Sequence, residues 1–174
     1  LATQLKAGIV SYNFFPYHTR DADGQFSAVI VGYSNEIARL TEADLEYRVF
    51  DSLDELLDAL KAGEIDFAVG LNKTAQRKKH FLFSTPFMEA PRGIVANQSI
   101  ANDALKNLAS LRWVCITGSS HCEYLVENGA LFINRFIKPD DAFKKVADGT
   151  FDALVCGAGV CKANGDLHVG LSCS

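Results

Sequence analysis

The pattern of apolar and polar positions is most regular in residues 52–69, where it predicts one helix followed by one strand. Four leucines recur at helical spacing after a capping box formed by Ser52 and Glu55, and Gly63 supplies the stop. Residues 65–69 then form a short apolar run, interrupted by a single aspartate, that is typical of a strand covered on both faces. A helix that leads into such a strand predicts a parallel α/β sheet.

The same alternation of helix and strand extends over the whole chain. Pro86 and Pro91 interrupt it, with extended segments around them at residues 81–83 and 92–97, and make a helix there improbable. The two prolines therefore mark a boundary between two series of elements. The first series is a strand at 5–10, a helix at 29–40 and a strand at 45–50, and the second is a helix at 102–109, a strand at 113–117, a helix at 120–127 and a strand at 131–137.

Residues 139–155 repeat the pattern of residues 53–69. When the two segments are aligned, glycines and apolar positions coincide, and Asp66 meets Asp152, so we interpret these aspartates as structural rather than catalytic. Chance similarity between two amphipathic pieces is the alternative. With the proline-flanked boundary, the repeat predicts two similar α/β lobes with mainly parallel sheets and a ligand cleft between them. We assign residues 1–91 to lobe 1, 92–168 to lobe 2 and 169–174 to the start of a return crossing.

Composition and charge add limits to this picture. The chain has 174 residues, of which 48% are hydrophobic and 22% charged, enough for one core or two small ones. A net charge of −4, with a basic block only at residues 77–80, points away from nucleic acid. No apolar run is long enough to cross a bilayer and residues 1–10 do not resemble a signal peptide, so we expect a soluble chain whose export signal has been removed.

Five cysteines lie in the C-terminal half, and their pairing is open. Pairing among Cys115, Cys122, Cys156 and Cys161 would suit an oxidising compartment, whereas buried free thiols are the alternative. No CxxC motif occurs, and the four histidines lie too far apart for a ligand spacing. We therefore expect no metal site and no cofactor.

Polar loops at the expected strand ends hold the candidate binding residues. Arg77 follows Gly70 and Asn72 in the loop after the first buried strand, and a guanidinium offers paired donors that match a carboxylate. The alternative is a solvated arginine at a helix start. Ser119 and Ser120 stand where a strand passes into a helix, where they could hold an anion or merely cap the helix.

Three stretches of the sequence together resemble a known family. They are the aromatic loop around Phe14, the run from Gly63 through Arg77 to Phe87, and residues 118–125. In these stretches the chain is similar to the bacterial periplasmic solute-binding proteins of the amino-acid type, family 3. The members of this family also occur as sensor domains of membrane receptors and are called Venus flytrap domains.

The resemblance implies a type II periplasmic-binding-protein fold, an extracytoplasmic or periplasmic location, and capture of a solute by lobe closure for transport or sensing. An ABC transporter or the membrane part of a receptor would be the partner. A hinge near residues 90–96 and a return crossing near Val169 are also implied. By position, Arg77 would hold a ligand carboxylate, Gly70, Asn72, Ser119 and Ser120 would contribute hydrogen bonds, and an aromatic ring at Phe14 would cover the ligand.

The chain departs from the family in two respects, its acidic residues and its length. The aspartate that holds a ligand ammonium is replaced by Gly157, and an acidic residue of the first loop by Ser11. Without these carboxylates a buried ammonium would lack its charge partner, so we expect an anionic, carboxylate-bearing solute without an α-amino group, or else a quite different solute. The chain also stops where the family returns to the first lobe, which suggests truncation and an exposed apolar surface that a second chain could cover in a dimer.

Two other functions stay open at this point. One is an enzyme on the same fold that resembles cyclohexadienyl dehydratase, which we disfavour because no acid occupies a convincing catalytic position. The other is an interaction domain that has lost its ligand.

Overall fold

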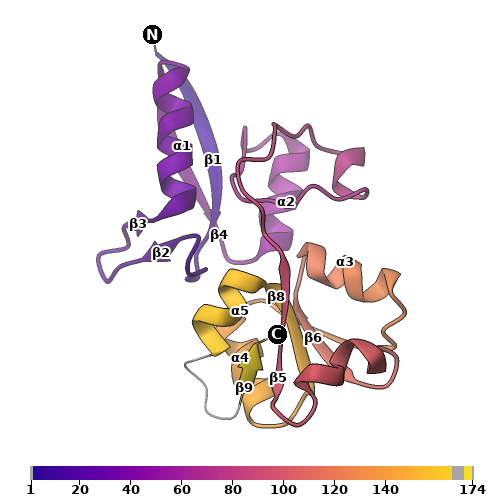
Figure 1. The fold of residues 1–174 in the computed structure, drawn as a ribbon. Helices are drawn as coiled ribbons and strands as arrows, with labels where there is room; N and C mark the ends of the chain where they lie inside the picture. The colour runs from indigo at the N-terminus through magenta and orange to yellow at the C-terminus, as the bar shows by residue number, and fades with distance from the viewer. Residues whose placement is uncertain (1, 166–170, 174) are drawn as a thin grey trace. The chain divides into compact units, whose positions relative to one another are not determined.

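The computed structural model describes residues 2–165 and 171–173, and the chain divides into two compact units. Unit 1 is Leu1–Pro86 and unit 2 is Phe87–Ser174 (Figure 1). The return crossing expected near Val169 lies outside the described residues. Among the described residues, no helix is both long and apolar enough to cross a membrane.

Unit 1 is built on a parallel pair of strands. Strand β1 (Thr3–Val10) pairs along its whole length with β4 (Ala43–Phe50). Helix α1 (Val29–Leu40) lies between them in the chain, since a parallel pair needs a crossover connection. The connection from β1 to α1 also contains a short antiparallel hairpin, β2 (Thr19–Arg20) with β3 (Phe26–Ser27). The predicted helix at residues 29–40 is confirmed with the same limits.

The helix predicted after Ser52 is also confirmed, as α2 (Leu53–Ala62). The Ser52 hydroxyl accepts the Glu55 backbone N–H at 3.1 Å, and Gly63 ends the helix in the left-handed conformation with φ 76°. The return bond of the capping box is displaced by one residue, because the Glu55 carboxylate accepts the N–H of Asp51 at 3.2 Å. The local sequence thus sets both ends of this helix.

The strand predicted at residues 65–69 is wrong. This segment forms a single parallel bridge, from Phe67 to Ala7, and within it only Ile65 is buried. Asp66 explains the difference, since its carboxylate accepts the Lys6 backbone N–H at 2.7 Å while its own N–H donates to the Lys6 carbonyl at 2.8 Å. A side-chain bond therefore replaces part of the ladder that a regular strand would make with β1.

Unit 2 contains a five-stranded mixed sheet in the order β7-β6-β8-β5-β9. Within it β6 pairs in parallel with both β7 and β8, whereas β5 runs antiparallel to β8 and β9. The expected hinge segment, residues 90–96, thus overlaps a strand that is hydrogen-bonded inside this sheet. The strands are β5 (Arg92–Asn97), β6 (Arg112–Ile116), β7 (Phe132–Phe136), β8 (Ala153–Gly157) and β9 (Leu171–Cys173).

Helices cover both faces of this sheet (Figure 1). Helix α3 (Ser120–Glu127) and the 3₁₀ helix η2 (Ala101–Asn107) pack on one face, where Trp113 lies at the centre of the core. Helices α4 (Pro139–Ala147) and α5 (Ala158–Gly165) cover the other face. The helix predicted at residues 102–109 is therefore wrong in type, because the segment winds as a 3₁₀ helix and not as an α-helix.

The internal repeat has a structural counterpart at its aspartates. In unit 2 the Asp152 carboxylate accepts the Arg112 backbone N–H at 2.7 Å, and the Asp152 N–H donates to the Arg112 carbonyl at 2.9 Å. This is the exchange that Asp66 makes with Lys6 in unit 1. Each aspartate binds the main chain of a neighbouring strand, at Lys6 within β1 and at Arg112 at the start of β6, which agrees with a structural role for each.

Candidate functional site

Arg77 lies in the polar loop that follows residues 65–69. It begins the 3₁₀ helix η1 (Arg77–Lys79), and its backbone N–H donates to the Thr74 hydroxyl at 3.1 Å. The residue is only 6% exposed, and its guanidinium Nη1 donates to the main-chain carbonyl of Asn72 at 2.9 Å. A solvated arginine, the alternative from sequence, is thus wrong. The loop holds a cation that is withdrawn from water and already oriented by a carbonyl.

Gly70 gives this loop its starting direction. Its φ is +87°, in the left-handed region that favours glycine. A Cβ added there would meet Ile30 Cδ1 of α1 at 3.3 Å, so space is also short. Gly70, Asn72 and Arg77 therefore belong to one loop, held by the conformation of Gly70 and by the hydrogen bond from Arg77 to the Asn72 carbonyl.

Phe14 lies in a second loop of unit 1, between β1 and β2. Its ring packs on Tyr17, with 5.4 Å between the centroids, and on His18 at 6.1 Å. His18 is 1% exposed, and its Nε2 lies 2.9 Å from the carbonyl of Tyr12 and 3.2 Å from that of Val10. Burial lowers the pKa of His18, and the two carbonyls oppose this only in part.

His18 is a residue that the sequence reasoning missed. A lone histidine without a metal spacing was set aside, although it follows a buried strand and stands among aromatic residues. That position was the available signal, because such a histidine can fix a loop by bonding to its main chain. The structure assigns it this role, beneath the loop that carries Phe14.

In unit 2, Ser119 and Ser120 stand at the carboxyl end of β6. Ser119 is the N-cap of α3, and its hydroxyl accepts the Cys122 backbone N–H at 3.4 Å. Both serines are buried. The capping interpretation of Ser119 is confirmed, and an anion-binding role for the pair stays a prediction.

Two disulfides, Cys115–Cys122 and Cys156–Cys161, each close a loop of unit 2 at the end of a strand. They settle the pairing of these four cysteines, which the sequence left open. The first joins β6 to α3 across Ser119 and Ser120, and the second joins β8 to α5 across Gly157. Since β6 and β8 pair in parallel, the two loops lie at the same edge of the sheet, where open α/β sheets bind ligands.

The predicted site residues thus fall into three loops. Gly70, Asn72 and Arg77 share one loop of unit 1, and Phe14 occupies another loop of the same unit. Ser119 and Ser120 belong to unit 2. At the position where an acidic residue was expected in the first loop, the Ser11 hydroxyl donates to the Asp51 carboxylate at 3.0 Å.

Known proteins share both the sequence pattern and the fold. The virulence sensor protein BvgS of Bordetella bronchiseptica is 26% identical over 144 residues, which are 82% of this chain but only 12% of that protein. The arginine-bound form of truncated ArgBP from T. maritima superposes with a TM-score of 0.83 at 25% identity, over 98% of this chain and 81% of that one. An ancestral amino acid-binding protein, AncCDT-1, a precursor of cyclohexadienyl dehydratase, shares the fold with a TM-score of 0.80 at 21% identity, over 98% and 77% of the two chains.

The family assignment rests on a match to most of the chain. A model of the bacterial extracellular solute-binding proteins, family 3, matches residues 7–155, which include every predicted site residue in both units. The chain belongs to the bacterial extracellular solute-binding proteins of family 3.

Proposed function

We propose that this chain captures a small carboxylate-bearing solute and that Arg77 is the anchor for the carboxylate. Membership of a solute-binding family makes it a binding protein rather than an enzyme. The observation that carries the finer proposal is the buried guanidinium of Arg77, oriented by the Asn72 carbonyl. A guanidinium fork matches a carboxylate with two parallel hydrogen bonds, and burial strengthens such bonds.

The remaining predicted residues would complete the site from both units. Gly70 and Asn72 belong to the same loop as Arg77, and the main-chain carbonyl of Asn72 contacts the guanidinium. Ser119 and Ser120 begin α3, whose N-terminal N–H groups favour negative charge. Phe14 would cover the solute with its ring. In this proposal a solute that touches both units holds them together, as in other proteins that close around a ligand.

The solute is expected to lack an α-amino group. Gly157 is the last residue of β8, where a carboxylate would be needed to pair with an ammonium, and a buried ammonium without such a partner is costly. In the first loop, Ser11 is hydrogen-bonded to Asp51. A useful probe pair is L-arginine, which the T. maritima relative binds, and 5-guanidinopentanoate, which lacks only the α-amino group. We expect the second compound to bind at least as tightly as the first.

Arg77→Ala and Arg77→Lys test the anchor by calorimetry. A thermal-shift screen of amino acids and organic acids first identifies a solute, because binding to the folded state alone raises the melting temperature. Loss of charge-assisted bonds should then weaken binding by about 10- to 100-fold in Arg77→Ala, and Arg77→Lys should not restore it, because an ammonium lacks the fork. Lys78→Ala, an exposed neighbour, is the matched control.

Unchanged affinity in Arg77→Ala would rule out this anchor. A screen in which no compound raises the melting temperature would instead favour the interaction domain without a ligand.

The setting of this activity is proposed to be the periplasm or another extracytoplasmic space. Two disulfides suit an oxidising compartment. The relatives include both a sensor protein and an arginine-binding protein, so delivery to an ABC transporter and sensing for a receptor are both compatible with the family. A dimer stays a prediction that sedimentation velocity can check.

A further inference from the structure

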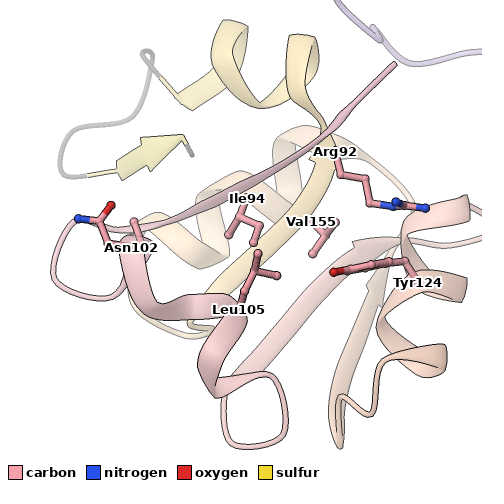
Figure 2. A pocket seen from close by; sticks show the side chains of 7 residues that line it. Arg92, Ile94, Asn102, Leu105, Tyr124 and Val155 are labelled. Carbon is pink, nitrogen blue, oxygen red and sulfur yellow. The ribbon is translucent and has the colours of Figure 1, made fainter. Parts of the chain in front are cut away.

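Unit 2 contains a pocket of its own. Its volume is ≈ 440 Å³, within the range of small-molecule sites, and it opens on the sheet face that η2 and α3 cover (Figure 2). All of its lining residues belong to unit 2. They include Arg92 and Ile94 from β5, Ala101 and Leu105 from η2, Tyr124 from α3 and Val155 from β8.

The floor and one wall of this pocket are apolar. Ile94 and Val155 form part of the unit 2 core, and Val155 is only 1% exposed. Leu105 stands on the wall formed by η2 and is 54% exposed, which is unusual for a leucine beside a core. Covering Leu105 with an apolar group would remove hydrocarbon surface from water and favour binding.

A cation stands at one end of the pocket. The Arg92 guanidinium carbon lies 4.4 Å from the centroid of the Tyr124 ring, so the ring face holds the cation in place. Within the part of the chain that the structure describes, the Arg92 guanidinium has this ring contact but makes no hydrogen bond or ion pair. Stacking fixes the plane of the group while its N–H donors, which point outward along that plane, stay able to meet an anion.

Tyr124 adds a polar atom on the apolar side. In Figure 2 its ring extends from α3 toward Val155 and Leu105, and the hydroxyl is at the end of the ring that faces these two side chains. Among the described residues this hydroxyl has no hydrogen-bond partner, although a phenol at a partly buried position usually finds one. The pocket therefore offers a fixed cation and a phenol at the border of an apolar floor.

We propose that this pocket is a second binding site, for a small organic acid with an apolar body. The carboxylate pairs with Arg92, and the body lies on Ile94 and Val155 against Leu105. The charge of Arg92 selects an anion, and the apolar floor selects against small hydrophilic acids. All the residues that line this pocket belong to unit 2, whereas Arg77 belongs to unit 1.

The test uses 3-phenylpropanoate as the probe and 3-phenylpropan-1-ol as its uncharged match, titrated into the whole chain and followed by amide chemical shifts. The acid is expected to shift the amides of β5, η2 and α3, and the alcohol to bind about tenfold or more weakly. Arg92→Gln should weaken binding of the acid by the same factor and leave binding of the alcohol unchanged. Arg135→Gln, an exposed arginine on β7 of the same sheet, is the control for overall charge and should change neither.

Three outcomes would overturn the proposal. The first is equal binding of the acid by the wild-type chain and Arg92→Gln. The second is a set of amide shifts confined to residues outside the pocket. The third is loss of acid binding in Arg77→Ala, which would place the probe in the site proposed for the transported or sensed solute. Leu105→Trp gives a second readout, because a larger side chain on η2 should fill the pocket and weaken acid and alcohol alike.

Discussion

His18 shows how one buried side chain can make stability depend on pH. Its Nε2 faces the carbonyls of Tyr12 and Val10, so this nitrogen carries the proton in the neutral form. Among the described residues, Nδ1 is buried without a hydrogen-bond partner. A second proton would therefore go to a buried atom that has no acceptor, and burial lowers the pKa of His18 below the ordinary 6.5.

The sign of the effect follows from this lowered pKa. Well above pH 6.5 the histidine is neutral in both the folded and the unfolded chain, so its titration does not change the free energy of unfolding. As the pH falls further, the unfolded chain takes up the proton first, so the free energy of unfolding decreases, by at most about 1.4 kcal/mol per pH unit. The loss ends where the folded pKa is reached.

Urea denaturation between pH 7.5 and about pH 5 checks this expectation. His18→Gln should show a flatter pH dependence than the wild-type chain, while His80→Gln, an exposed histidine, should keep the wild-type slope. Equal slopes in His18→Gln and the wild-type chain would show that His18 does not control this pH dependence.

At the scale of single residues, the sequence predicts chemical type better than environment. Arg77 stands out because a polar loop ends in a lone guanidinium, but its burial depends on contacts with Asn72 and Thr74 that spacing cannot reveal. His18 was missed for the same reason. Its function depends on two carbonyls that reach it only after the loop has folded.

At the scale of elements, the two disulfides act on the loops that carry the proposed unit 2 residues. Each closes a short loop, of sequence separation 7 for Cys115–Cys122 and 5 for Cys156–Cys161. Such small loops place their stabilisation near the lower end of the usual range, about 2 kcal/mol. Their larger effect is expected to be on the position of Ser119 and Ser120, which follow the end of β6.

The double variant Cys115→Ser with Cys122→Ser tests this positioning role. It should lower the free energy of unfolding of unit 2 by about 2 kcal/mol and also weaken binding of the solute found in the thermal-shift screen. The variant Cys156→Ser with Cys161→Ser is the matched comparison for a disulfide of similar loop size. If the first variant loses stability but binds the solute with wild-type affinity, the disulfide does not position the serines.

Local signals predict the helices well, and long-range pairing decides the rest. The limits of α1 and α3 were predicted correctly because the apolar spacing of α1 and the N-cap of α3, Ser119, are local signals. Residues 65–69 look like a strand by composition, yet the bond between Asp66 and Lys6, distant in sequence, takes the place of a ladder. Likewise η2 has a helical composition, but it winds as a 3₁₀ helix over the core of unit 2.

At the scale of the whole molecule, each unit has a hydrophobic core of its own. The core of unit 1 includes Val10, Leu56 and Ile65, and that of unit 2 includes Trp113 and Val155. Trp113 is the only tryptophan of the chain and is fully buried, so its fluorescence reports on unit 2 alone. We therefore expect two unfolding transitions, of which the fluorescence follows one and far-UV circular dichroism follows both.

Leu56→Ala, a truncation in the core of unit 1, separates the two transitions. It should destabilise unit 1 by about 3 kcal/mol and leave the midpoint seen by Trp113 fluorescence unchanged. A shift of both signals together would show that the chain unfolds as a single cooperative unit.

Unfolding followed by Trp113 fluorescence and by far-UV circular dichroism also distinguishes the two proposed sites when a ligand is added. A solute held by Arg77 from unit 1 and by Ser119 and Ser120 from unit 2 binds only when both units are folded, so it should raise the midpoint of whichever unit unfolds first. An organic acid held by Arg92 and Tyr124 needs unit 2 alone and should raise only the midpoint seen by fluorescence. A solute that raises the midpoint of the unit that unfolds second, when the other unit is already unfolded, would contradict the two-unit site, because it would then bind to one unit alone.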